Sequence, residues 1–160
     1  MKSNYKFWSG NKIPSTPGAI FVFGSNPEGR HGAGAARSAK MHYGATYGKG
    51  RGLSGQSYAL VTKNLTPNYH EKCSGITYEK AGNRSLTFDQ IKANISEMYD
   101  LARKLKYLEF YVVYRADSVN LNGYSPSVIW SMFTEDLDVP ENVFFHNSYE
   151  KVLYQNEQTN

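Results

Sequence analysis

The chain has 160 residues, a length that suits one domain, and 40% hydrophobic with 14% aromatic residues can form a buried core. No apolar run approaches the roughly 20 residues of a membrane span. The first eight residues also lack the apolar stretch of a secretory signal. Cys73 is the only cysteine, which excludes an internal disulfide and a cysteine-based metal cluster. We therefore expect a cytoplasmic protein with no membrane partner.

The charge balance is mildly basic, with a net charge of +4 and a pI near 9.0. Such an excess suits an anionic ligand such as a nucleotide diphosphate, and it is compatible with weak nucleic-acid contact. The basic residues are scattered along the chain and form no dense block. Charge alone therefore does not favour nucleic acid as the partner.

The N-terminal part of the chain predicts strand, loop, strand and helix in turn. Residues 4–8 predict a short edge strand, and residues 9–18, with two prolines and two glycines, predict a loop. Residues 20–23 are four bulky apolar residues between turn-forming residues, which indicates a buried central strand. The alanine-rich residues 33–43 predict a helix.

Between that strand and that helix lies a glycine-rich turn with Gly29, Gly32 and Gly34. A strand, such a turn and a helix in this order form an arrangement that binds phosphate. The free N–H groups and the positive dipole end of the helix face whatever lies above the turn. An ordinary glycine-alanine turn that binds nothing is the alternative, and the pattern alone does not separate the two.

The next stretch predicts a second glycine-rich loop at 47–56 and a strand at 57–62. Residues 64–86 lack periodicity and predict an unusually long loop, as in lids and binding loops. His70 and Cys73 lie in this loop. Because no neighbour marks Cys73 as activated, we expect a solvated cysteine there and not a catalytic pair.

The C-terminal part predicts two helices and two strands. Thr87 as the N-cap residue, with a glutamine three residues later, forms a capping box before a helix with one apolar face. Residues 108–114 predict a second strong strand, followed by a polar loop. Ser125 then caps another helix. Residues 142–146 predict a last strand, and residues 155–160 a frayed tail.

Strands that alternate with helices predict an α/β fold with a mixed, mainly parallel sheet. In such sheets, ligands bind beyond the carboxyl ends of the strands. Residues 24–34 and 117–124 both follow strong predicted strands, so we expect them to border one cleft.

Several sequence segments together resemble a macro-domain-like family of bacterial and phage proteins, and they cover roughly residues 19–146. They are Phe21–Asn26, Gly29–Ala36, Gly52–Ala59, Thr62-Lys63, Arg84–Thr87 with the helix after it, Asn122–Tyr124 and Asn142-Val143. The resemblance implies a three-layer α/β/α fold over a single domain at 1–154. It also implies an ADP-ribose-type ligand, free or on an ADP-ribosylated macromolecule. We expect no cofactor and no metal.

The resemblance also implies which residues hold the ligand. Asn26 would contact the distal ribose, the loop at 32–34 would hold the diphosphate, and Tyr124 would pack against the distal ribose. The full predicted binding set is Gly24, Ser25, Asn26, Arg30, His31, Gly32, Ala33, Gly34, Gln56, Asn122, Gly123 and Tyr124.

Two activities follow from this resemblance. One is hydrolysis of an ADP-ribose derivative, such as removal of phosphate from ADP-ribose 1″-phosphate or cleavage of an ADP-ribosyl ester. Asn26 would then hold the ribose, and His31 or Asp117 would act on water. The other is a non-catalytic module that reads or sequesters such nucleotides, with His31 only bonding the loop.

The chain also departs from relatives of this family. They usually carry a Gly-Cys-Gly sequence after the strand at 108–114, whereas this chain continues with Arg115-Ala-Asp-Ser-Val-Asn-Leu-Asn122. The changed loop argues against hydrolysis of the ligand more than it argues against binding. The acidic residue that contacts the adenine amine in relatives is also unmatched, and Asn11 lies near its position.

Two other classes of enzyme are excluded. The order of glycines in Gly29–Gly34 is G-x-x-G-x-G, not the G-x-G-x-x-G of dinucleotide-binding enzymes, and no acidic residue follows at the required distance. The four histidines show no recognised metal-ligand spacing.

Overall fold

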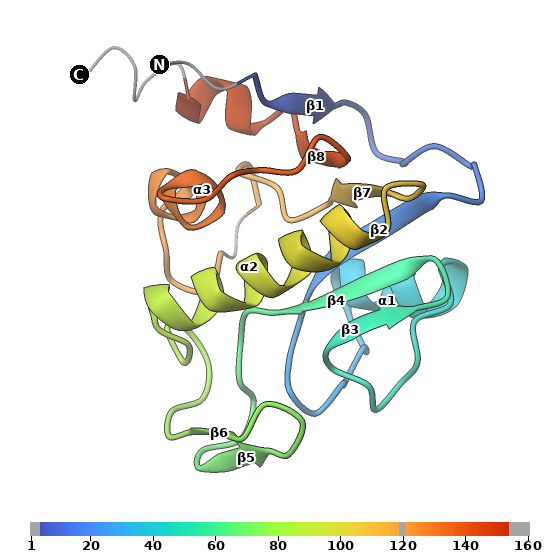
Figure 1. Cartoon of the computed structure of the whole chain (residues 1–160). Coiled ribbons are helices and arrows are strands. Elements are labelled where there is room, and N and C mark those ends of the chain that lie inside the picture. The colour runs from blue at the N-terminus through green and yellow to red at the C-terminus, as the bar shows by residue number, and fades with distance from the viewer. Residues whose placement is uncertain (1–3, 119–120, 154–160) are drawn as a thin grey trace.

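The structure is a computed structural model that describes residues 4–118 and 121–153 (Figure 1). Its named helices and strands follow one another along the chain. The helices are α1 (Gly34–His42), α2 (Phe88–Lys104) and α3 (Pro126–Thr134). The strands are β1 (Lys6–Trp8), β2 (Ala19–Ser25), β3 (Gly52–Ser54), β4 (Ser57–Val61), β5 (Tyr69–Glu71), β6 (Ile76–Tyr78), β7 (Glu109–Val112) and β8 (Val143–His146).

Six strands form one mixed sheet in the order β1-β8-β7-β2-β4-β3. All neighbouring pairs are parallel except β3 and β4, which form an antiparallel hairpin. The predicted α/β class with a mainly parallel sheet is therefore confirmed. The edge strand near the N-terminus and the central position of β2 are confirmed as well.

Alternation along β2 places its side chains in two apolar clusters, one on each face of the sheet. Ile20 and Val22 join the cluster formed with α2 and α3. Phe21 and Phe23 join the cluster that includes Ala39 of α1. Helices thus cover both faces, and β2 is buried along nearly its whole length. It pairs with β7 over Ala19–Val22 and with β4 over Phe21–Ser25.

The helix boundaries follow the predicted capping residues. The capping box of Thr87 and Gln90 is present at the start of α2, and Ser125 caps α3 with Pro126 in the first turn. The apolar residues of α2, including Ile91, Ile95 and Met98, are buried as expected. None of the helices in the described residues is long and apolar enough to cross a membrane.

Two predicted loops are wrong in part. The glycine-rich stretch 47–56 contains the short strand β3, and the long loop 64–86 contains the hairpin of β5 and β6. Each of these strands has only three residues, too few to show periodicity. The predicted tail at 155–160 lies outside the described residues.

A network of charged and polar side chains joins the β5–β6 hairpin to Arg51 and, through Arg51, to α2. Arg51 donates to both carboxylate oxygens of Glu71, at 2.8 and 3.2 Å, and also to Asn94 and Glu97 on α2. Burial acts to raise the pKa of Glu71, but the hydrogen bonds that it accepts outweigh burial and hold this pKa below its usual value. The position of the hairpin therefore depends on residues that lie outside it in the sequence.

Candidate functional site

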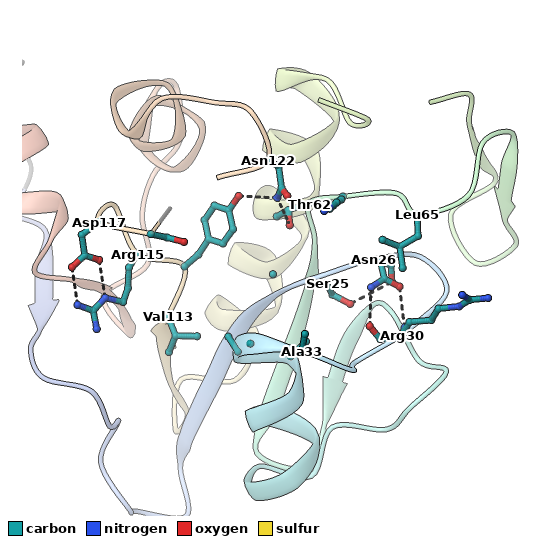
Figure 2. A pocket seen from close by; sticks show the side chains of 17 residues that line it. Ser25, Asn26, Arg30, Ala33, Thr62, Leu65, Val113, Arg115, Asp117 and Asn122 are labelled. Carbon is teal, nitrogen blue, oxygen red and sulfur yellow. Dashed lines mark hydrogen bonds and ion pairs between the residues drawn. The ribbon is translucent and has the colours of Figure 1, made fainter. Parts of the chain in front are cut away.

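A cleft of about 680 Å³ lies at the carboxyl ends of β2, β4 and β7 (Figure 2). This is the edge of the sheet where the strand-end rule places ligands. The lining residues come from four segments of the chain. They are Gly24, Ser25, Asn26, Arg30, Ala33, Gly34, Ala35, Ala36, Thr62, Lys63, Leu65, Val113, Tyr114, Arg115, Asp117, Ser118 and Asn122.

The first loop of the cleft is closed by the side chain of Asn26. Its Nδ2 donates to the carbonyl oxygen of Arg30 at 3.1 Å, and its Oδ1 accepts from the Arg30 N–H at 3.0 Å. Asn26 is only 8% exposed. Gly29, at φ +69°, lies against Gly48, where a Cβ atom would overlap the facing backbone. The predicted ribose-binding amide thus lines the cleft while it fixes the loop.

His31 lies beneath this loop and does not line the cleft. It is 1% exposed, its Nε2 lies 3.3 Å from the Ser25 hydroxyl, and its ring packs edge-on against Phe23. Burial, followed by the charge of Lys40, lowers its pKa. Its imidazole is therefore neutral at physiological pH and supports the loop from inside.

The N-terminus of α1 opens into the cleft through Ala33, Gly34, Ala35 and Ala36. Ala33 is the N-cap residue in an extended conformation, and no side chain caps the helix. The first turn also contains no acidic residue. The amides of this turn thus face the cleft without a capping acceptor, which is the arrangement that binds an anion.

The floor of the cleft joins two strand ends to the loop at 121–124. Nδ2 of Asn122 donates to the hydroxyl of Thr62 at 3.2 Å and to that of Tyr114 at 2.8 Å. A Cβ atom on Gly24 would lie 3.1 Å from Oγ1 of Thr62 and 3.2 Å from the Tyr114 ring. Glycine at position 24 therefore lets this ring cover the end of β2.

Arg115 and Asp117 form a bidentate ion pair at one end of the cleft. Nε and Nη2 of Arg115 each lie 2.8 Å from an oxygen of Asp117, and Nη1 donates to Asn11 at 3.1 Å. The hydrogen bond from Arg115 is the main reason that the pKa of Asp117 is below its usual value. Asp117 is therefore an ionised carboxylate tied to a guanidinium.

The other end of the cleft carries cationic groups. Arg30 and Arg115 lie on opposite sides of Ala33 in Figure 2. The Arg30 side chain is 61% exposed and lies 3.4 Å from Glu28. Lys63 lines the cleft directly after β4 and makes no ion pair with any residue that the structure describes. These charges favour an anionic occupant.

Besides His31, four predicted site residues do not line the cleft: Gly32, Gln56, Gly123 and Tyr124. Gln56 precedes β4 at the opposite end of the sheet, where its amide donates to Thr16 and Pro17. The Tyr124 hydroxyl donates to the carbonyl of Leu86, and Arg84 stacks on its ring. The aromatic residue at the cleft is instead Tyr114.

Several lining residues are absent from the predicted set, and the rule that led to the cleft could have found four of them. Thr62 and Lys63 directly follow β4, and Tyr114 and Arg115 come just after β7. Residues one to three positions beyond a parallel strand lie at this edge of the sheet whatever loop follows.

Comparison of the chain with protein-family models, with curated proteins and with solved structures finds no match. Within residues 4–118 and 121–153, no group of three or more His, Cys, Asp or Glu could hold a metal ion. Cys73 is exposed and lies outside the cleft, on the β5–β6 hairpin. The cleft therefore has to be interpreted from its own geometry.

Proposed function

We propose that the cleft binds ADP-ribose or a related NAD-derived nucleotide, with the diphosphate at the N-terminus of α1. The observation that carries this proposal is the uncapped first turn of α1, with no acidic residue, opening into a cleft of about 680 Å³. Small-molecule sites commonly measure about 300–1,000 Å³. The macro-domain-like sequence segments supply the choice of ADP-ribose among dianionic ligands.

The surroundings of the helix terminus suit the rest of such a ligand. Lys63 and Arg30 add positive charge beside the amides of Ala35 and Ala36. The hydroxyl oxygens of Thr62 and Tyr114 both accept a hydrogen bond from the side-chain amide of Asn122. Each hydroxyl proton is therefore available to donate to the other hydroxyl or to a sugar oxygen. The cleft thus combines phosphate-binding amides with hydroxyl groups that match a ribose.

We further propose that the module binds its ligand without hydrolysing it. Hydrolysis needs a group that accepts a proton from water at the scissile bond. His31 is buried outside the cleft, and Asp117 is held in its ion pair with Arg115. Among the described cleft-lining residues, Asp117 is the one carboxylate, and its lowered pKa makes it a weak base. These observations favour the reader or sponge over the hydrolase.

Calorimetric titration with ADP-ribose and with ADP-ribose 1″-phosphate tests the proposal, with phosphate release measured in the same samples. We expect both nucleotides to bind and no phosphate to appear. Asn26→Ala should weaken binding by about ten-fold or more, because it removes both bonds that close the first loop. Gln56→Ala is the matched control outside the cleft and should bind as the wild type does.

The outcomes separate the two parts of the proposal. No heat with either nucleotide, from protein whose circular dichroism shows it folded, would refute the ADP-ribose assignment. Phosphate release that is lost in Asp117→Asn would restore the hydrolase and give Asp117 its catalytic role. Equal losses in the Asn26 and Gln56 variants would place the ligand elsewhere.

A further inference from the structure

Charge is unevenly distributed along the chain. Residues 29–70 contain six Lys and Arg and no Asp or Glu, whereas the rest of the chain holds twelve Lys and Arg against all fourteen Asp and Glu. The excess positive charge of the protein thus comes entirely from one 42-residue stretch. This stretch contains α1, the glycine-rich loop after it, β3 and β4.

The fold brings most of these cations together beside α1. Arg37 and Lys40 are exposed on the helix, and Nζ of Lys40 lies 5.0 Å from the ring of Tyr47 in the following loop. That loop packs on the cleft loop, since the Gly48 N–H donates to the Gly29 carbonyl at 2.8 Å. Arg30 and Lys49 are the exposed residues that follow these two glycines. We call Arg30, Arg37, Lys40, Lys49 and Tyr47 the basic face.

The charges of the basic face are largely uncompensated. Arg37, Lys40 and Lys49 form no ion pair with any residue in the described parts of the chain, whereas Arg30 lies 3.4 Å from Glu28. By contrast, Arg51 of the same stretch is neutralised by Glu71 and Glu97. The face therefore keeps a positive field at the surface.

An aromatic ring lies among these cations. Tyr47 is 56% exposed, and the neighbouring Met41 of α1 is 61% exposed. Single exposed apolar side chains are common on protein surfaces and carry no weight alone, but the ring of Tyr47 lies within reach of a cation. Cations that follow a phosphate backbone, with a ring on which a base can stack, are the means by which proteins bind single strands.

We propose that the basic face binds single-stranded nucleic acid, with phosphates on its four cations and a base against Tyr47. A duplex fits less well because its bases are already stacked and cannot reach the ring. The proposal does not depend on ADP-ribose binding, because three of the four cations lie outside the cleft. The scattered basic residues of the sequence gain this role only through folding.

Fluorescence anisotropy with a labelled oligonucleotide of roughly 16 nucleotides tests this proposal. We expect log K to fall with log salt at a slope of about −3, as four neutralised phosphates of a single strand require. The variant Arg37→Gln/Lys40→Gln/Lys49→Gln should bind at least ten-fold more weakly, with a slope near about −1. Tyr47→Ala should weaken binding by about ten-fold, with the slope unchanged.

The matched control removes the same charge elsewhere. Lys72, Lys80 and Lys106 are exposed and lie outside the basic face, so Lys72→Gln/Lys80→Gln/Lys106→Gln should bind as the wild type does. Absence of binding, or equal weakening in the two triple variants, would overturn the proposal. Stronger binding to a duplex of the same length would overturn it too. Equal competition by polyglutamate of matched charge would assign the face to acidic proteins instead.

ADP-ribose titration of the same variants keeps the two proposals separate. The basic-face variants should retain ADP-ribose binding. The Asn26→Ala variant changes the loop that carries only one of the four cations, Arg30, so it should weaken oligonucleotide binding far less than the triple variant does. A variant that lost both would have to be checked for unfolding by circular dichroism before either result is used.

Discussion

Placing a carboxylate at the N-cap of α1 should strengthen the fold and weaken ligand binding at the same time. Ala33 is exposed, lies at the cleft and has the extended backbone that a capping residue needs. In Ala33→Asp, the new side chain can accept from the amides of Ala35 or Ala36. These are the amides that we assign to the diphosphate, so the new side chain competes with the ligand for the same donors.

The size of each effect follows from the geometry. A capping side chain in place of alanine stabilises a protein by about 1 kcal/mol, which raises Tm by about 2–4 °C in a chain of this length. For the ligand, loss of an amide donor to a charged oxygen costs about 1.5–3 kcal/mol, and repulsion by the carboxylate adds to this. We expect the Kd for ADP-ribose to rise by about 100-fold or more.

Two further substitutions at this position separate capping from charge. Ala33→Asn caps the helix without a charge, so Tm should rise while binding weakens less than with aspartate. Ala33→Gly should leave binding nearly unchanged. Thermal unfolding and calorimetry on one set of samples measure both effects. A stabilised Ala33→Asp protein with wild-type affinity for ADP-ribose would show that the diphosphate does not lie at this helix terminus.

Three predictions concern the fold. Gly50→Ala should lower the free energy of unfolding by at least about 2 kcal/mol in urea titrations, because its Cβ would overlap the backbone of the cleft loop; unchanged stability would contradict this close approach. Burial lowers the pKa of His31 and His146, so the unfolded chain binds more protons than the folded protein near pH 6.5. The free energy of unfolding should have its full value above about pH 6.5. Below that pH it should fall by up to about 1.4 kcal/mol per pH unit for each histidine. Urea titrations across pH should find a smaller slope in His31→Gln, and an equal slope would refute the assignment. Arg51→Met should lower the free energy of unfolding by about 3–5 kcal/mol, because it leaves the carboxylate of Glu71 buried without its cation. Adding Glu71→Leu should recover part of that loss in urea titrations. A double variant that is less stable than Arg51→Met would contradict this.

The parts of the fold that sequence could predict are those determined by local patterns. The helix after Thr87 carries its start in the capping box and its buried face in the spacing of Ile91, Ile95 and Met98, so it was predicted correctly. β2 is bounded by turn residues and consists of strand-favouring side chains. The β5–β6 hairpin has no such pattern, because its stability comes from Arg51, which lies 20 residues before Glu71.

The candidate site shows a similar division. The strand-end rule predicted which loops border the cleft, because the parallel direction of the strands follows from the alternation of strands and helices. The rule does not say where each side chain points. Asn122 and Gly123 adopt positive φ angles of 57° and 85°, which turn the chain so that Tyr124 meets Leu86. The rule does indicate that Tyr114 lies at this edge of the sheet, but no local pattern in the sequence indicates that its ring, and not that of Tyr124, would line the cleft.

Both asparagines of the cleft use their side-chain amides for hydrogen bonds within the protein. Asn26 closes the first loop, and Asn122 joins the floor to two strand ends. A ligand would therefore meet backbone amides and hydroxyl groups whose positions are fixed before it arrives. Because groups that are already ordered lose little entropy on binding, such a cleft can bind a flexible nucleotide such as ADP-ribose tightly with few direct side-chain bonds. By this reasoning, loss of the Asn26 amide acts through the position of the loop, and it should speed ligand release far more than it slows association.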